Sequence, residues 1–93
     1  MGGLKRVYVR VSGRVQGVGF RYFTQHQAQA LGLAGFVRNR PDGDVEMEAE
    51  GLSNRVSELV DAVRRGPPGS HVREVHTGDR PAEGIDSEFD IRF

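Results

Sequence analysis

The residue types that could hold an anion are gathered in one short stretch of the sequence. Residues 13–21 read Gly-Arg-Val-Gln-Gly-Val-Gly-Phe-Arg and lie between an alternating apolar segment and an amphipathic one. Glycines let successive backbone N–H groups converge on one point without Cβ clashes. The first N–H groups of the following helix would be unpaired, at the positive end of its dipole. The guanidinium of Arg21, in the first helical turn, would add a planar fork that fits two phosphate oxygens at once.

These features predict an anion site at the junction of a strand and a helix. A plain tight turn, whose arginine pairs with a surface carboxylate, accounts for the same spacing equally well. Arg14, in the same stretch, is expected to face solvent beside the site, where it could attract an anionic substrate.

Hydrophobic periodicity predicts the elements that would position this stretch. Alternating apolar and polar residues indicate strands, and apolar residues at helical spacing indicate helices. The predicted strands cover 4–12, 35–40, 44–50, 71–77 and a last segment in which Phe89, Ile91 and Phe93 alternate; the predicted helices cover 20–31 and 54–65, and a loop covers 78–87. The turn at 41–43 joins the second and third strands into a hairpin.

Finer features of these elements can also be predicted. The apolar stripe of the first helix is expected to hold Phe20, Phe23, Ala30 and Leu31. Ser53 is a suitable N-cap for the second helix. In the fourth strand Val72 and Val75 break the alternation, which indicates a bulge or an irregular edge.

The order of the elements predicts the fold class. Strand, helix, strand, strand, helix, strand (βαββαβ) favours an α+β, ferredoxin-like two-layer sandwich, in which both helices pack on one face of a mainly antiparallel sheet of four to five strands. Residues 1–93 would form a single domain with the first and third strands inside the sheet. The first two strands would then be parallel, so Asn39, at the end of the second, could lie near the glycine-rich loop. Its amide both donates and accepts, so it could orient a water; a turn-stabilising role is the alternative.

Composition makes several other classes of function unattractive. Thirteen basic and thirteen acidic side chains give no net charge, whereas a nucleic-acid binder of this size is usually basic. Cysteine is absent, which excludes thiolate catalysis and cysteine metal sites. No apolar leader or membrane-spanning run is visible, so we expect a cytoplasmic chain.

Acidic residues and histidines give no metal site by their spacing. Glu46, Glu48 and Glu50 are expected on one solvent-facing side of a strand, with Arg6 and Arg10 across from them. The three histidines, which are expected on the surface, are His26, His71 and His76.

Two segments of the chain together resemble the acylphosphatase family. Residues 13–21 resemble its first signature, and residues 35–39 followed by 42–46 resemble its second. Similar residues also stand at 50–51, 66–68 and 89–93, so the resemblance covers nearly the whole chain. Phe36 stands where the family commonly has tryptophan, and Arg40 where a threonine often follows the asparagine.

The resemblance implies hydrolysis of an acyl phosphate to a carboxylate and inorganic phosphate, with no metal and no other cofactor. It implies catalytic roles for Arg21, which binds the phosphoryl group, and for Asn39, which orients the attacking water. The phosphate-binding backbone amides that it implies are those of Gln16, Gly17, Val18 and Gly19. The expected partner is a small-molecule acyl phosphate, with no nucleic acid and no membrane, and the chain is expected to be a monomer.

Two other functions remain open from the sequence. A ferredoxin-like module without catalytic activity could bind an anion, a nucleotide or a partner chain through the same loop, because a fold does not fix a function. An acylphosphatase-like unit could also serve within a larger protein that handles carbamoyl phosphate.

Overall fold

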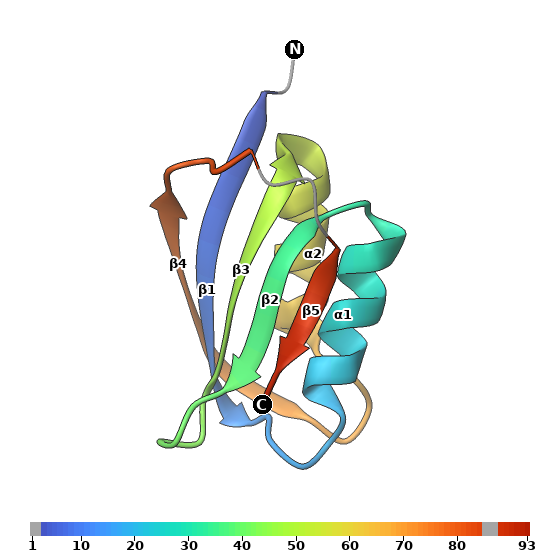
Figure 1. Cartoon of the computed structure of the whole chain (residues 1–93). Coiled ribbons are helices and arrows are strands. Elements are labelled where there is room, and N and C mark those ends of the chain that lie inside the picture. Colours follow the sequence, from blue (N-terminus) through green and yellow to red (C-terminus); the bar gives the residue numbers. More distant parts are fainter. Residues whose placement is uncertain (1–2, 85–87) are drawn as a thin grey trace.

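Five strands and two helices make up the computed structural model, which describes residues 3–84 and 88–93. In chain order they are β1 (Leu4–Arg14), α1 (Phe20–Ala30), β2 (Ala34–Asn39), β3 (Val45–Leu52), α2 (Ser53–Arg65), β4 (His71–Arg80) and β5 (Phe89–Arg92). The strands form one sheet in the order β4-β1-β3-β2-β5, and both helices pack on one of its faces (Figure 1). The predicted two-layer, ferredoxin-like sandwich is confirmed, with β1 and β3 inside the sheet.

Strand directions decide which ends of the elements meet. β1 and β2 each pair antiparallel with β3, so they are parallel to each other. The C-terminal ends of β1 and β2 therefore lie at the same edge of the sheet, where α1 also begins (Figure 1). β5 adds to the outer side of β2 in the parallel direction and ends at this edge too. The fold thus brings four segments of the chain to one place.

The core lies between the sheet and the helices. Its strand residues alternate with polar ones, as expected for a sheet with one apolar face. The main buried side chains are Val7, Val9, Val11, Val37, Val45, Met47, Phe20, Leu59, Val63 and Phe89.

The buried stripe of α1 differs from the predicted one. Phe20, Thr24 and Ala28 are buried, one turn apart, whereas Phe23 is only half-buried and Ala30 is exposed. Thr24 can be buried because its Oγ1 donates to the carbonyl of Phe20 at 2.9 Å. A prediction of the buried face from hydrophobic residues alone misses Thr24, because it does not take account of a polar group that is hydrogen-bonded within the helix.

The start of α2 also differs from the prediction. The N-cap position is Leu52, and Ser53 is the first helical residue, with no side-chain cap. β3 runs directly into α2, so no loop residue is left to cap it. Ser53 Oγ instead donates to the carbonyl of Gly3 at 3.3 Å. Over the residues that the structure describes, neither helix has the length and apolar character to cross a membrane.

β4 contains the predicted irregularity but is longer than predicted. Its register against β1 shifts between Ser12 and Gly13, which leaves Arg73 as an extra residue and confirms a bulge. The strand continues to Arg80, where a loop was predicted from Gly78. The end of that predicted loop, 85–87, lies outside the described residues.

The acidic row of β3 lies across from β1 as predicted, with Arg6 opposite Glu50 and Arg10 opposite Glu46, but it is not exposed to solvent as predicted. Glu46 and Glu50 are only 7% and 3% exposed, and Arg6 is 5% exposed. The side chains of neighbouring strands pair with one another on the sheet face away from the helices. The backbone N–H groups of Glu83 and Gly84 also donate to Glu50, both at 2.8 Å. A segment beyond β4 therefore covers the Glu50 end of the row.

Candidate active site

The loop between β1 and α1 depends on two glycines in left-handed backbone conformations. Gly17 and Gly19 have φ values of 73° and 75°. A Cβ at either position would meet no atom within 4 Å, so the requirement is conformational rather than steric. Gly13, by contrast, belongs to β1, and a Cβ there would collide with the carbonyl oxygen of His71 at the bulge. Gly13 therefore serves the packing of β4, and the loop proper begins after Arg14.

The N-terminus of α1 is open to an anion. Gly19 is the N-cap residue and provides no side-chain cap, and the first turn holds no acidic residue. It holds Arg21 instead, although a basic residue there opposes the helix dipole. Violations of a local preference of this kind are typical of functional sites.

Arg21 and Asn39 line the same small cavity, although they come from different elements. The cavity has a volume of about 100 Å³. Its lining residues are Val15, Gly17, Gly19, Phe20, Arg21, Tyr22 and Asn39. Asn39 is the last residue of β2, and it reaches the cavity because β2 ends at the edge where α1 begins. Four of the six predicted site residues thus meet here.

The side chain of Arg21 is held by the end of the chain. Its Nη1 donates to the carbonyl of Arg92 at 3.3 Å, and its Cζ lies 4.6 Å from the centre of the Phe93 ring. Within residues 3–84 and 88–93, no carboxylate forms an ion pair with it. Among the described residues, Arg21 therefore does not neutralise a surface carboxylate, which was the alternative interpretation of the sequence.

The other two predicted loop residues, Gln16 and Val18, do not line the cavity. Gln16 Nε2 donates to the carbonyls of Arg40 and Asp44 at 2.8 and 2.9 Å, so its side chain faces the β2–β3 hairpin. Val18 is partly buried against the core. The predicted role of their backbone amides in binding phosphate stays a prediction.

Two features of the site were missed from the sequence. Tyr22 lines the cavity while its side chain is 59% exposed, and its only sequence signal is its position next to Arg21. The contacts of Arg92 and Phe93 with Arg21 had no local signal, because they depend on how β5 joins the sheet. Arg14 is exposed, as expected.

Charged side chains behind Asn39 form a paired network. Arg40 contacts Asp42 at 3.0 Å and Glu46 at 3.1 Å, so its charge is neutralised on the hairpin. Burial alone would raise the pKa of Glu46, but hydrogen bonds from Tyr8, Arg40 and Arg38 outweigh it and keep the pKa below its ordinary value. Glu46 is therefore engaged by two arginines and a tyrosine hydroxyl behind Asn39.

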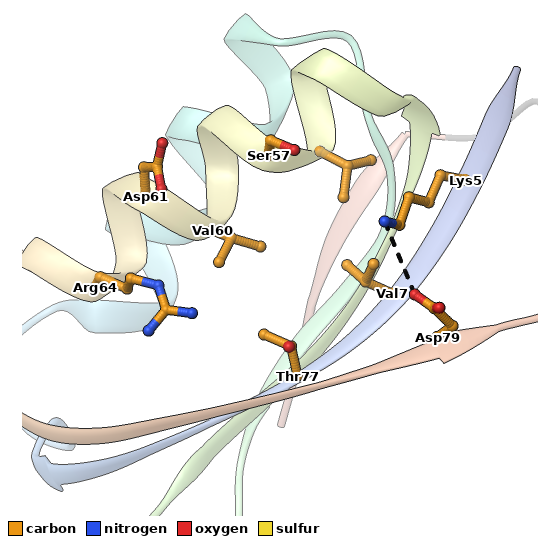
Figure 2. A pocket seen from close by; sticks show the side chains of 9 residues that line it. Lys5, Val7, Ser57, Val60, Asp61, Arg64, Thr77 and Asp79 are labelled. Atoms are coloured by element: carbon orange, nitrogen blue, oxygen red, sulfur yellow. Dashed lines mark ion pairs between the residues drawn. The ribbon is translucent and has the colours of Figure 1, made fainter. Parts of the chain in front are cut away.

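Two other hollows lie away from the predicted site residues. One of about 200 Å³ lies between α2 and the strands β1 and β4, where Val7 and Val60 face a rim that includes the Lys5–Asp79 ion pair (Figure 2). Another, of about 330 Å³, is lined by Arg6, Phe36 and Arg92 among others. In the described part of the chain, no three of the histidine and carboxylate side chains are grouped so as to hold a metal ion. The three histidines are exposed, as predicted.

Comparison with known proteins shows the family to which this chain belongs. The family model described as acylphosphatase matches residues 7–91. An acylphosphatase of Syntrophotalea carbinolica is 48% identical over 88 residues, which cover 95% of this chain and 96% of that protein. The crystal structure of acylphosphatase from Bacillus subtilis superposes with a TM-score of 0.91 at 44% identity, covering 98% of this chain and all of that one. An acylphosphatase structure from Coxiella burnetii has the same TM-score at 36% identity, covering 96% of this chain and 93% of that one. The chain belongs to the acylphosphatase family.

Proposed function

We propose that this chain is an acylphosphatase that hydrolyses acyl phosphates without a metal ion. Arg21 and the loop N–H groups from Gln16 to Gly19 bind the phosphoryl group, and Asn39 orients the attacking water. One observation carries the proposal: Arg21 and Asn39 line the same cavity of about 100 Å³ as the left-handed glycines of the loop.

The chemistry asks mainly for positioning and for stabilisation of charge. Water attacks phosphorus, the bond between phosphorus and the acyl oxygen breaks, and the carboxylate leaves with the bonding electron pair. Negative charge on the three other phosphoryl oxygens is stabilised by the guanidinium of Arg21 and by backbone N–H groups. The proton of the water passes to a phosphoryl oxygen, so no protein side chain has to act as a general base. A carboxylate is a good leaving group, so no general acid is needed either.

The size of the cavity suits the reactive end of the substrate. About 100 Å³ is roughly three times the ~30 Å³ that a water molecule occupies in the liquid. This is room for a phosphoryl group, and the acyl group extends outward past the exposed ring of Tyr22. The site therefore reads the phosphoryl end and accepts acyl groups of different structure.

The donor set of the site favours chemistry without a metal. Arg21 supplies a permanent positive charge at the place where a cation would otherwise be required. Among the described residues, the lining of the cavity includes no carboxylate, histidine or cysteine.

The test is hydrolysis of benzoyl phosphate in excess chelator, with the parent beside Arg21→Ala and Asn39→Ala. We expect rapid turnover by the parent that resists the chelator, and a loss of at least about 100-fold in each variant. A folded parent without turnover would overturn the proposal and favour a module that only binds anions. Sedimentation of the same parent sample checks the further prediction that the chain is a monomer.

A further inference from the structure

We infer that the side chain of Gln16 is a positioning residue, which fixes the spacing between the phosphate-binding loop and Asn39. The inference rests on the proposed function. It assigns to Gln16 a role separate from that of its backbone amide: the side chain acts through Asn39 and does not contact the substrate.

The evidence is a pair of hydrogen bonds, here called the Gln16 bridge. Both protons of the amide nitrogen are used, since Nε2 donates to the carbonyl of Arg40 at 2.8 Å and to that of Asp44 at 2.9 Å. Arg40 also donates its N–H to the Asp44 carbonyl at 2.8 Å, closing the hairpin. The bridge therefore ends on the residue directly after β2 and on the residue directly before β3, where the hairpin begins to turn.

The path through the bridge from loop to Asn39 is short. Gln16 is the covalent neighbour of Gly17, which lines the cavity, and Arg40 is the covalent neighbour of Asn39, which lines it from the other side. Among residues 3–84 and 88–93, the bridge supplies the side-chain hydrogen bonds that join the loop 15–19 to the hairpin 39–45. A loop with two left-handed glycines has little stiffness of its own, so a bridge of this kind sets where it lies.

Spacing of this kind matters for turnover more than for phosphate binding. The phosphoryl group is held by Arg21 and the loop, whereas the water must be held at the correct distance from phosphorus by a group on the hairpin. A displacement of about 1 Å between such groups can lower a rate by about 100-fold. Loss of the bridge should therefore lower kcat while leaving the affinity for phosphate nearly unchanged.

Gln16→Met removes the donors but keeps the length of the side chain. Gln25→Met is the matched control, because Gln25 Nε2 also donates to a distant backbone carbonyl, that of Phe89 at 3.2 Å, and is also half-buried. Gln25 is outside the cavity. With benzoyl phosphate at a temperature where all variants are folded, we expect Gln16→Met to lower kcat by roughly 10- to 100-fold. The inhibition constant for inorganic phosphate should change by less than about threefold, and Gln25→Met should keep the parent kcat.

A double-mutant cycle with Asn39→Ala separates positioning from mere stabilisation. If Gln16 acts through Asn39, adding Gln16→Met to Asn39→Ala lowers kcat by less than about twofold further. The inference is overturned if the full loss recurs in the Asn39→Ala background, if the phosphate inhibition constant rises as much as kcat falls, or if Gln25→Met loses as much activity. A parent without turnover, or an Asn39→Ala variant with the parent kcat, would overturn the proposed function first and this role with it.

Discussion

Arg21 Nη1 donates a hydrogen bond to the backbone carbonyl of Arg92 across 71 residues of sequence, at a distance of 3.3 Å. Arg21 also lines the cavity that Asn39 lines. The first helix and the last strand are thus joined at the residue on which the proposed chemistry depends most.

Replacing Arg21 should remove activity with little effect on stability. Arg21→Ala is expected to lower kcat/KM by at least about 100-fold, because a guanidinium fork that stabilises the phosphoryl charge is lost. Arg21→Lys should restore little of it, since an ammonium presents a point charge rather than a planar fork. Urea denaturation of Arg21→Ala should give a free energy of unfolding within about 1 kcal/mol of the parent, because losing the exposed contacts with Arg92 and Phe93 is offset in part by removing a basic residue that opposes the helix dipole. Turnover of the lysine variant at the parent rate would show that the fork is not needed.

Phe93 should support Arg21 while contributing little to folding. Its side chain is 93% exposed, yet its ring lies 4.6 Å from the Arg21 guanidinium. An exposed cation–π contact is worth about 0.5–1 kcal/mol, so Phe93→Ala is expected to weaken inhibition by phosphate by about two- to fivefold. Thermal denaturation should give nearly the parent midpoint. An unchanged inhibition constant would mean that the carbonyl of Arg92 alone holds Arg21 in place. Phe93→Leu, which keeps an apolar side chain without the π face, is the control.

Two glycines of the same signature should respond differently to alanine. Gly13→Ala places a Cβ against the carbonyl of His71, so β4 must move and the free energy of unfolding should fall by about 3 kcal/mol or more. Gly19→Ala meets no atom and should cost only about 1–2 kcal/mol, for a left-handed backbone. Its larger effect should be on phosphate binding, measured by inhibition. Equal stability losses in the two variants would contradict the separation of packing from site geometry.

Glu50 should make stability depend on pH. The backbone N–H groups of Glu83 and Gly84, with Arg6, hold the pKa of Glu50 below its ordinary value of 4.5, against the effect of burial. A carboxyl with a depressed pKa stabilises the folded state fully above its ordinary pKa, and this stabilisation is lost as pH falls through the folded value. Urea denaturation between pH 3 and 7 should therefore show a fall in the free energy of unfolding on the acid side.

Glu50→Gln is the variant that tests this assignment. It should lower stability at pH 7 by about 2 kcal/mol, because charge-assisted hydrogen bonds are weakened, and it should flatten the acid-side fall. Glu58→Gln, on the exposed face of α2, is the control and should leave both unchanged. A curve for Glu50→Gln parallel to that of the parent would assign the pH dependence to other carboxylates.

The sequence was sufficient for the order of the elements and for the meeting of Arg21 with Asn39. The short strand pattern of β2, the alternation in β3 and the turn at 41–43 predict the hairpin between β2 and β3, and the direction of strands in a βαββαβ fold then places the end of β2 beside the loop. The roles of Arg21 and Asn39 came from a resemblance to a known family, and the structure adds their common cavity.

Contacts between side chains distant in sequence could not be predicted in the same way. The burial of Glu46 and Glu50 depends on Arg6, Tyr8 and the segment at 83–84, none of which is a neighbour in sequence. The alternation of residues shows that these glutamate side chains point away from the apolar face of the sheet. It does not show which residues cover the opposite face. The contacts of the Gln16 side chain could not be predicted either. The sequence pattern concerned only the backbone N–H of Gln16 as a phosphate ligand, and it carried no signal that the side-chain amide reaches the hairpin.

The parallel pairing of β5 with β2 has a consequence for the order in which the site is assembled. During synthesis on a ribosome, the loop, α1 and Asn39 emerge before residues 89–93. The site that they form is therefore completed only when these last residues have been made. A nascent chain that ends before β5 would carry both signatures and yet lack the backbone carbonyl and the ring that hold Arg21. Because β5 pairs with β2, a strand far from it in sequence, its docking is a slow, non-local step. Full affinity for phosphate would then be reached only after most of the sheet has formed, when the last strand is in place.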